Sequence, residues 1–296
     1  MKSKLFFAFL LLALSASAAS TVQTQHFELA DSVRFYEPDD PQSDGYKFSK
    51  IVTADWPVTI NGKKSQALND FLIEEVFYAS HNPNSFTGSI SDVNTLTGCV
   101  KNWMSYILHS SAMAGEYIVK DYGTPGVKDI TSEQDPMRCM YELTNLKQSH
   151  VVGDLVFFVE YNEIYYGGVH PDYMYNYYAF DAALDRPIRL DDIITDRSKL
   201  LRMLPKYDKR GKDVKWWDSI KDVDLGNFYI KDGNMVFPFA PYAIGPFSEG
   251  EVEVKVPLKA LNSKGMLTTY GKNYLKSNTG NKGNKGKKAK KAKKRK

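Results

Sequence analysis

The chain has 296 residues, of which 43 % are hydrophobic and 25 % are charged, which is typical of a folded globular protein and argues against a wholly disordered chain. Its length suits one or two domains with a sizeable core. The formal net charge of +4 misdescribes the body, because the last sixteen residues hold ten lysines or arginines and no acid. Without those ten charges the net charge falls from +4 to −6, and to about −8 once Lys2 and Lys4 are also removed.

The first residues have the three parts of a secretory signal peptide. Lys2 and Lys4 precede an apolar run over residues 5–14, and small residues at 16–18 offer a cleavage site. The run is shorter than the roughly 20 apolar residues that a membrane helix needs, and no later segment has that character. We therefore expect cleavage after Ala18 or Ala19 and a periplasmic or secreted protein without a transmembrane segment.

The N-terminal half predicts strands, two helices, and then strands again. Residues 26–36, 46–54 and 57–60 have strand character. Ser65 is placed to cap a helix that reaches residue 80, and a second helix is expected from Asp92 onward. Strands are expected again at 116–122 and 137–146. The two cysteines of the chain, Cys99 and Cys139, are a candidate disulfide in an oxidising compartment, with separate buried thiols as the alternative.

The C-terminal half is richer in strands. Residues 155–162 begin apolar on both faces, which is typical of a strand inside a sheet, and residues 173–181 form another strand. Helical turns are expected at 198–203 and near Trp217. Asp232-Gly233 predicts a hairpin with a type I′ turn, and residues 251–258 alternate as a final half-buried strand. The fold class expected is α+β, with mostly antiparallel sheets and a few packed helices in two subdomains.

The stretch IYYGGVHPDYMYNYYAFD, residues 164–181, admits three interpretations. Gly167 and Gly168 permit positive φ, which favours a strand–turn–strand unit. Seven of the nineteen tyrosines lie in residues 161–178, which favours an exposed binding surface. A hydrolase site using His170 and nearby carboxylates is the third, although His-x-Asp alone is a weak signal.

The candidate binding residues are the tyrosines, glycines and polar groups of this stretch together with one tyrosine of a later turn. They are Tyr165, Tyr166, Gly167, Gly168, His170, Asp172, Tyr173 and Tyr242. The histidines are scattered and no metal-ligand spacing is present, so we expect no metal, no cofactor and no catalytic residue.

Three neighbouring segments resemble a family of unknown function: YYGGVHP, the tyrosine-rich strand after it, and IRLDDII. That family forms the extracellular domain of the RsiV anti-sigma factor and accompanies some peptidoglycan deacetylases. FPFAPYAIGPFSEGEVEVKVPLKAL, residues 237–261, is similar to its aromatic hairpin, proline-tyrosine turn and last strand. Ala243 stands where many relatives have Glu, and Gly245 where many have Ala. The N-terminal half resembles the usual partner domain.

The resemblance implies a non-catalytic exported binding module of the cell envelope, since the RsiV domain recognises host lysozyme. The partners it implies are a lysozyme-like protein or a cell-wall glycan, and we do not expect anti-sigma signalling or deacetylation. The alternatives are a glycan hydrolase or deacetylase-type enzyme, and an electrostatic adaptor acting through its tail.

Composition and resemblance together predict four segments. They are a signal peptide (1–19), an N-terminal α+β domain (20–148), an RsiV-like α+β domain (149–270) and a disordered lysine-rich tail (271–296). The tail is expected to be disordered, because it has too few apolar residues to offset the entropy of ordering. Its dense positive charge suits attachment to an anionic surface, with a solubilising tail that has no dedicated partner as the alternative. Lysine tracts also bind nucleic acid, but we do not expect that partner for an exported protein.

Overall fold

The computed structural model describes the body of the chain with internal gaps. The described residues are 19–36, 46–87, 90, 92–110, 118–121, 139–210, 217 and 225–276. The expected signal peptide and most of the lysine-rich tail, residues 1–18 and 277–296, lie outside them.

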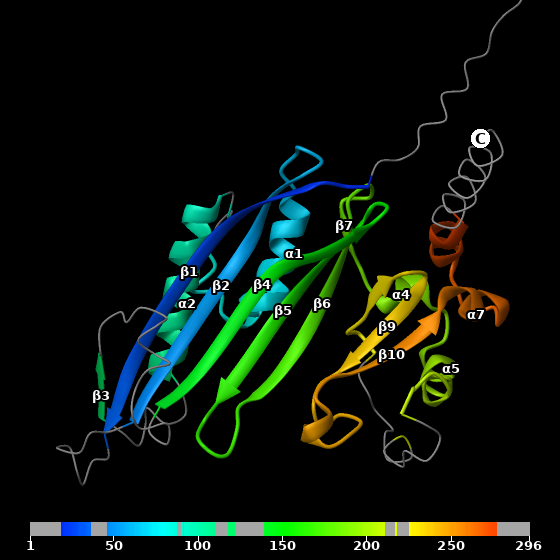
Figure 1. Cartoon of the computed structure of the whole chain (residues 1–296). Coiled ribbons are helices and arrows are strands. Elements are labelled where there is room, and N and C mark those ends of the chain that lie inside the picture. The colour runs from blue at the N-terminus through cyan, green and yellow to red at the C-terminus, as the bar shows by residue number, and fades with distance from the viewer. Residues whose placement is uncertain are drawn as a thin grey trace, which may run out of the picture.

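A long twisted sheet is the centre of the molecule (Figure 1). Within the described residues it has seven strands in the order β3-β1-β2-β4-β5-β6-β7. The strands are β1 (Val22–Tyr36), β2 (Tyr46–Ile60), β3 (Ile118–Asp121), β4 (Cys139–Val152), β5 (Leu155–Tyr165), β6 (Asp172–Asp181) and β7 (Arg186–Ile188). Each neighbouring pair is antiparallel except β2 and β4.

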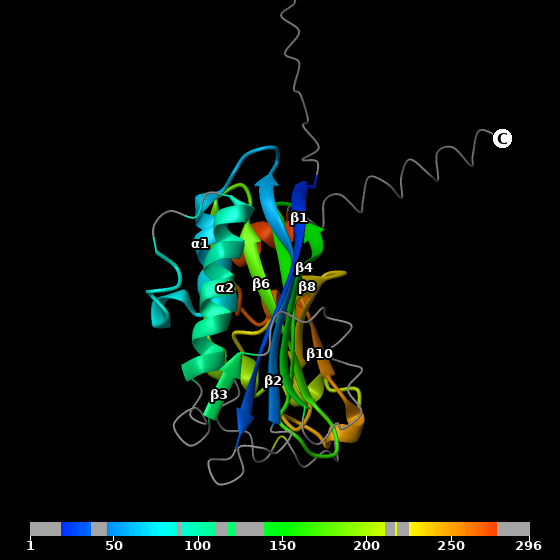
Figure 2. The same cartoon turned by 90° about the vertical axis from the view of Figure 1, so that its left-hand side faces the viewer.

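The parallel pair follows from the long connection between β2 and β4, since parallel strands need a crossover. Helices α1 (Gln66–Phe77) and α2 (Val93–Ser110) lie in this crossover and cover one face of the sheet (Figure 2). The Ser65 side chain accepts a hydrogen bond from the Leu68 backbone N–H at 2.9 Å and so caps α1 as expected. The helix ends at Phe77, three residues earlier than expected, where Tyr78 turns left-handed (φ 50°), and a short 3₁₀ turn, η1 (Ala79–His81), follows.

A second, smaller sheet covers part of the opposite face. Its order is β10-β9-β8, built from β8 (Tyr229–Lys231), β9 (Asn234–Phe239) and β10 (Val252–Pro257). Asp232 and Gly233 both have positive φ, 51° and 78°, as a type I′ hairpin requires. Short helical segments surround this sheet: α4 (Leu190–Ile193), α5 (Arg197–Leu201), η4 (Leu204–Lys206), η5 (Phe247–Glu249) and α7 (Leu258–Ser263). The molecule therefore has three layers: helices, long sheet and small sheet (Figure 2).

Two apolar cores lie on opposite faces of the long sheet. The helix-side core joins α1 and α2 to the sheet through residues such as Leu72, Leu96 and Phe158. The other core joins the small sheet and the short helices to Leu155, Phe157 and Ala179. Alternation along β5 and β6 sends neighbouring residues into different cores.

The α+β class and the mostly antiparallel pairing expected from the sequence are confirmed. The expected break between residues 54 and 57 is wrong, because β2 runs through Pro57 as one strand, with a register shift in its partner β1. The division expected at residue 148 falls inside β4, and both expected domains contribute strands to the long sheet. Among the helices of the described residues, none combines the length and apolar character needed to cross a bilayer.

Cys99 is a half-buried cysteine in α2 without a disulfide partner among the described side chains. Burial raises the pKa of this thiol. The side chain of Cys139, at the start of β4, lies outside the described residues, so the Cys99–Cys139 disulfide stays a prediction.

Candidate functional site

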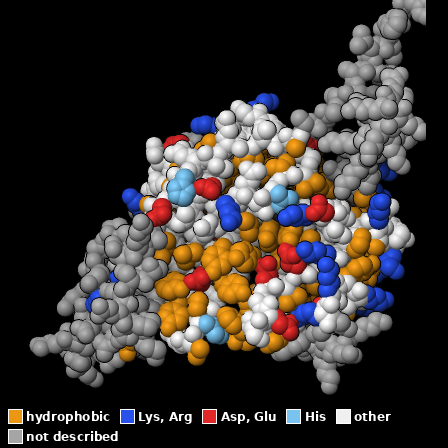
Figure 3. All heavy atoms as spheres, viewed as in Figure 1, with side chains coloured by type: hydrophobic (Ala, Val, Ile, Leu, Met, Phe, Trp, Pro, Cys, Tyr) orange, Lys and Arg blue, Asp and Glu red, His pale blue; other side chains and the backbone are white. Residues whose placement is uncertain are grey.

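The face of the long sheet opposite the helices carries a group of tyrosines at the end of the β5–β6 hairpin. We call this group the tyrosine face: Tyr141, Tyr161, Glu163, Tyr165, Tyr173 and Tyr175. Register pairs them directly across strands, with Tyr141 opposite Tyr165, Tyr161 opposite Tyr175, and Glu163 opposite Tyr173. All six are partly exposed, because the small sheet covers only the other end of β5 and β6. Figure 3 shows hydrophobic and tyrosine side chains gathered here, with acidic groups among them.

The rings of the tyrosine face contact one another and share one carboxylate. The Tyr161 and Tyr175 ring centroids are 5.0 Å apart, and those of Tyr141 and Tyr165 are 5.8 Å apart. Glu163 accepts hydrogen bonds from the hydroxyls of Tyr141, at 2.5 Å, and Tyr161. Burial and the neighbouring Glu163 carboxylate raise the pKa of both phenols. The surface is thus ordered before any partner arrives.

Glu251 adds a second carboxyl at the edge of this surface. Its charge raises the pKa of Tyr175 and Tyr177, although burial is the larger cause for both. Burial and the nearby Glu253 carboxylate raise the pKa of Glu251 itself to about 7. Its Oε2 atom is buried without a hydrogen-bond partner among the described residues. Glu163 and Glu251 have no Lys or Arg partner within the described part of the chain, so this surface is acidic as well as aromatic.

The glycine pair forms the turn that ends the tyrosine face. Gly167 and Gly168 have φ of 90° and 118°, which few other residues adopt, and the Tyr165 hydroxyl donates to the Gly168 carbonyl at 3.0 Å. His170 stacks on Phe247, with ring centroids 3.6 Å apart, and its Nδ1 lies 3.1 Å from the Pro171 carbonyl. This stack joins the glycine turn to the proline-tyrosine turn.

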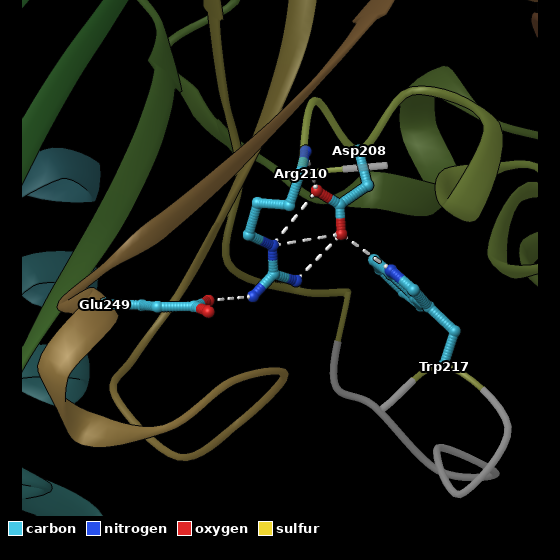
Figure 4. Close-up of polar contacts among 4 residues, drawn as sticks. All are labelled: Asp208, Arg210, Trp217 and Glu249. Atoms are coloured by element: carbon cyan, nitrogen blue, oxygen red, sulfur yellow. Dashed lines mark hydrogen bonds and ion pairs between the residues drawn. The ribbon is translucent and has the colours of Figure 1, made fainter. Parts of the chain in front are cut away.

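A charge cluster built on the buried Asp208 holds the 240–250 loop against the rest of the C-terminal half (Figure 4). Arg210 bridges the carboxylates of Asp208, at 2.7 Å, and Glu249, at 2.5 Å. The Trp217 indole N–H donates to Asp208 at 2.8 Å. Burial opposes ionisation of Asp208, but the Arg210 and Trp217 donors outweigh it and lower the pKa of this carboxyl.

Gly245 lies where this cluster approaches the loop. A Cβ atom at residue 245 would lie 2.6 Å from both the Arg210 Nη1 atom and the Glu249 Oε2 atom, so with Ala the ends of these two side chains would have to move away from the loop. The sequence alone does not show this contact.

The helix side of the same strands holds a cavity of about 460 Å³. Three pairs of polar residues that are direct cross-strand neighbours line it: Lys50 with Glu142, Thr144 with Asn162, and Glu160 with Asn176. Each pair is also hydrogen bonded, at 2.5, 3.0 and 3.1 Å respectively. We call this feature the polar cavity.

The two glutamates of the polar cavity, Glu142 and Glu160, have different charged neighbours. Burial disfavours the charged form of Glu142, but Lys50 and the Tyr166 hydroxyl outweigh it and lower the pKa of the carboxyl. Lys50 also lies over the Trp103 ring, 4.4 Å from its centroid. Glu160 has no Lys or Arg beside it in the part of the chain that the structure describes. Burial therefore raises its pKa, although donors from Tyr178 and Asn176 oppose the shift.

The eight residues singled out from the sequence divide between the two sides of the sheet. Tyr165, Tyr173 and His170 lie toward the tyrosine face. Asp172 and Tyr242 line the polar cavity. Tyr166 donates to Glu142 of that cavity, and the exposed glycine pair connects the two sides. The structure thus does not gather them into one pocket.

Sequence reasoning missed most of the polar cavity. Its residues come from four strands, from both α1 and α2, and from the loop after β9, so no local spacing brings them together. One signal was available in β5, where the helix-side positions change from Val156 and Phe158 to Glu160 and Asn162. A polar change on a face that should stay apolar marks a possible site.

His170 has no carboxylate as a hydrogen-bond partner among the described contacts. Within the described residues, no group of three or more His, Cys, Asp or Glu is arranged to hold a metal ion.

These features define a two-sheet α+β protein with an exposed acidic tyrosine surface and a polar cavity on the other side of the same strands. A model of the family described as "Protein of unknown function (DUF3298)" matches residues 188–259, from the end of β7 into α7. The matched segment contains the 240–250 loop, and the tyrosine face lies outside it. Comparison with curated proteins finds no match.

Two solved structures of DUF3298 family members are similar to the chain. One, from Bacteroides fragilis, is 16 % identical with a TM-score of 0.55, and the match covers 87 % of this chain and 100 % of that structure's chain. Another, from Pseudomonas aeruginosa, is 12 % identical with a TM-score of 0.48, and the match covers 83 % of this chain and 95 % of that structure's chain. The first likeness shows a shared fold. The closer relation to the RsiV domain, and the nature of the N-terminal half as its partner domain, stay predictions.

Proposed function

We propose that this chain is an exported, non-catalytic binding module of the cell envelope that binds a cationic protein on its tyrosine face. The observation that carries the proposal is the composition of that surface. Packed, partly exposed tyrosine rings surround Glu163, and Glu251 lies at their edge; neither carboxyl has a cation partner among the described residues. Aromatic rings supply most of the contact energy in such interfaces, and unpaired acids select a basic partner.

The charge of the whole body supports the same partner. The formal net charge without the basic tail and the leader is about −8, which speeds encounter with a basic protein. The sequence resemblance to a lysozyme-recognising domain makes a lysozyme the first partner to test. Export rests on the leader-like sequence of residues 1–18.

The rigidity of the surface also favours binding. The shared Glu163 carboxylate fixes two hydroxyls, and the His170–Phe247 stack fixes the turn. A surface ordered in advance loses less conformational entropy when the partner docks.

The proposal is tested by calorimetric titration of the chain with hen egg-white lysozyme at low and physiological salt. We expect saturable binding that the double substitution Tyr161→Ala, Tyr175→Ala weakens by at least about tenfold, the loss of one ordinary aromatic contact. Tyr106→Ala, an exposed tyrosine of α2 on the other side of the molecule, is the matched control and should not change affinity.

Two further arms separate the competing functions. Deletion of residues 277–296 should leave lysozyme affinity unchanged; loss of binding would favour the electrostatic adaptor. In an assay of wall-glycan hydrolysis, a non-catalytic binding module should give the same result with and without His170→Ala. A hydrolase that uses His170 would lose turnover in this variant. Binding of wall glycans to the tyrosine face, with no binding of lysozyme, would contradict the choice of a cationic protein partner.

A further inference from the structure

The polar cavity has the build of a small-molecule site. Its floor is buried, with Glu160, Lys50 and Trp103 only 3 %, 5 % and 5 % exposed. Its border includes Tyr78 and Tyr242, which are 60 % and 57 % exposed. Its volume of about 460 Å³ lies within the range of roughly 300–1,000 Å³ usual for ligand pockets. Its polar floor lies on the other side of β4, β5 and β6 from the tyrosine face, and Tyr173 is the one residue of that face that also lines the cavity.

Stability alone does not account for the polar floor. Replacing a buried ion pair by apolar residues is often neutral or stabilising, and the same face of β5 and β6 is otherwise apolar at Phe158 and Phe180. The Trp103 indole N–H is buried without an acceptor among the described residues, although its ring lines the cavity. A buried donor of this kind costs free energy unless something accepts from it.

The arrangement of donors and acceptors indicates the ligand class. Lys50 is paired with Glu142, so the residues that line the cavity offer no unpaired cation to an anionic ligand. Lys50 also lies over the Trp103 ring, so an ammonium group of a ligand cannot bind that face of the ring. Asn162, Asn176 and Thr144 mix donors and acceptors, as hydroxyl groups do. Tyr78 and Tyr242 supply apolar ring faces at the border.

We propose that the polar cavity binds one ring of a neutral, hydroxyl-rich saccharide. The sugar hydroxyls contact the Asn162, Asn176 and Glu160 side chains, and one of them accepts from the Trp103 indole N–H. The ring carbons pack against the border tyrosines. This site does not depend on the tyrosine face, so either proposal can fail alone.

The test uses the isotope-labelled full chain in NMR titrations with glucose, N-acetylglucosamine and the N-acetylglucosamine trimer at millimolar concentrations. The Trp103 indole signal, assigned by its absence in Trp103→Phe, should move and saturate with at least one neutral sugar. A monosaccharide response indicates a free sugar ligand. A response to the trimer alone indicates the end of a polymer.

Trp103→Phe removes the orphan donor together with the five-membered part of the indole ring. We expect its sugar affinity to fall about tenfold, the effect of one lost hydrogen bond, while its melting temperature falls less than that of Trp56→Phe, which also loses a satisfied hydrogen bond. Trp56→Phe is the matched control, because the buried Trp56 indole donates to Asn69 at 2.9 Å and does not line the cavity. It should lose stability and keep sugar affinity.

Three results would overturn the proposal. The first is the absence of any saturable shift with the neutral sugars. The second is an unchanged affinity in Trp103→Phe. The third is a response to glucosamine or inorganic phosphate in place of neutral sugars, since it would assign the cavity to an ion.

Discussion

The two sides of β4, β5 and β6 differ in how they use the same strands. On the helix side, near the glycine turn, polar residues pair across strands beneath a crossover of helices and line a cavity. On the other side, tyrosines pair across the same strands and stay partly exposed. One alternating sequence thus builds a recess and a surface, separated by the thickness of a single sheet.

This difference shows how the elements packed on a sheet determine which side chains suit each position. At the other end of the strands both sides are covered, and Phe157 and Phe158 are fully buried in different cores. Toward the turn, the small sheet stops and the tyrosines remain open to solvent. Because tyrosine has a ring and a hydroxyl, it suits a half-covered position better than phenylalanine.

The largest loss of stability is expected from breaking the charge cluster that holds the 240–250 loop, because this loop borders both the polar cavity and the tyrosine face. Asp208→Asn removes the buried charge that pairs with Arg210. We expect the free energy of unfolding to fall by about 3 kcal/mol, because Asp208 is itself buried and Arg210 then keeps only the exposed Glu249 as a charged partner. Urea denaturation at neutral pH measures the change.

Asp191→Asn is the control for that experiment. Asp191 pairs with Arg197 at 2.7 Å, but its side chain is 67 % exposed, so the loss should stay below about 0.5 kcal/mol. Equal losses in the two variants would show that the Asp208–Arg210 cluster is no more important than an ordinary surface pair.

Phe247→Ala should give a smaller loss. The Phe247 ring contacts His170, Tyr173 and Tyr242, and therefore joins the loop to the glycine turn. Since this ring is half-buried, we expect a loss of about 2 kcal/mol, below that of a core phenylalanine. Thermal melting of the variant beside Leu184→Ala, an exposed residue at another turn, measures it. A loss no greater than that of Leu184→Ala would contradict the packing role.

The smallest effect concerns the pH dependence of stability. Burial and Glu253 raise the pKa of Glu251 to about 7, above the ordinary value of 4.5. The folded protein therefore binds this proton more tightly than the unfolded chain does, and the resulting stability is lost as pH rises from about 4.5 through 7. Glu251→Gln should reduce that loss and be more stable than the parent at pH 8.

Glu253→Gln should behave in the opposite way, because Lys255 and Tyr229 outweigh burial and lower the pKa of Glu253. Its substitution should reduce stability at neutral pH.

On the helix side, Glu160 has a raised pKa owing to its burial. Glu160→Gln should therefore also flatten the decline of stability with rising pH. Unfolding curves between pH 4 and pH 8 test all three variants, and a parallel decline in Glu251→Gln and the parent would refute the assignment.

Local features of the sequence predicted much of the fold. The Ser65 cap, the Asp232-Gly233 hairpin and the alternation of β10 each depend on neighbouring residues, and each appears in the structure. The parallel pairing of β2 with β4 depends on how two helices pack and has no local signal. The break expected near Trp56 was wrong because Pro57 is accommodated at the register shift between β1 and β2.

The candidate site was predictable only in part. The tyrosine-rich hairpin was visible because its residues are close in sequence. The polar cavity was not, since Lys50, Trp103 and Glu160 come from three distant segments. The role of Gly245 was also hidden, because it depends on Arg210, thirty-five residues away.

NMR on the isotope-labelled chain can map where lysozyme binds. We predict that added lysozyme shifts and broadens signals of Tyr161, Glu163 and Tyr175, while signals of Glu160, Asn162 and Asn176, their neighbours on the other side, change far less. Perturbations confined to the helix side, or to the lysine-rich residues 277–296, would contradict the claim that the tyrosine face is the docking surface.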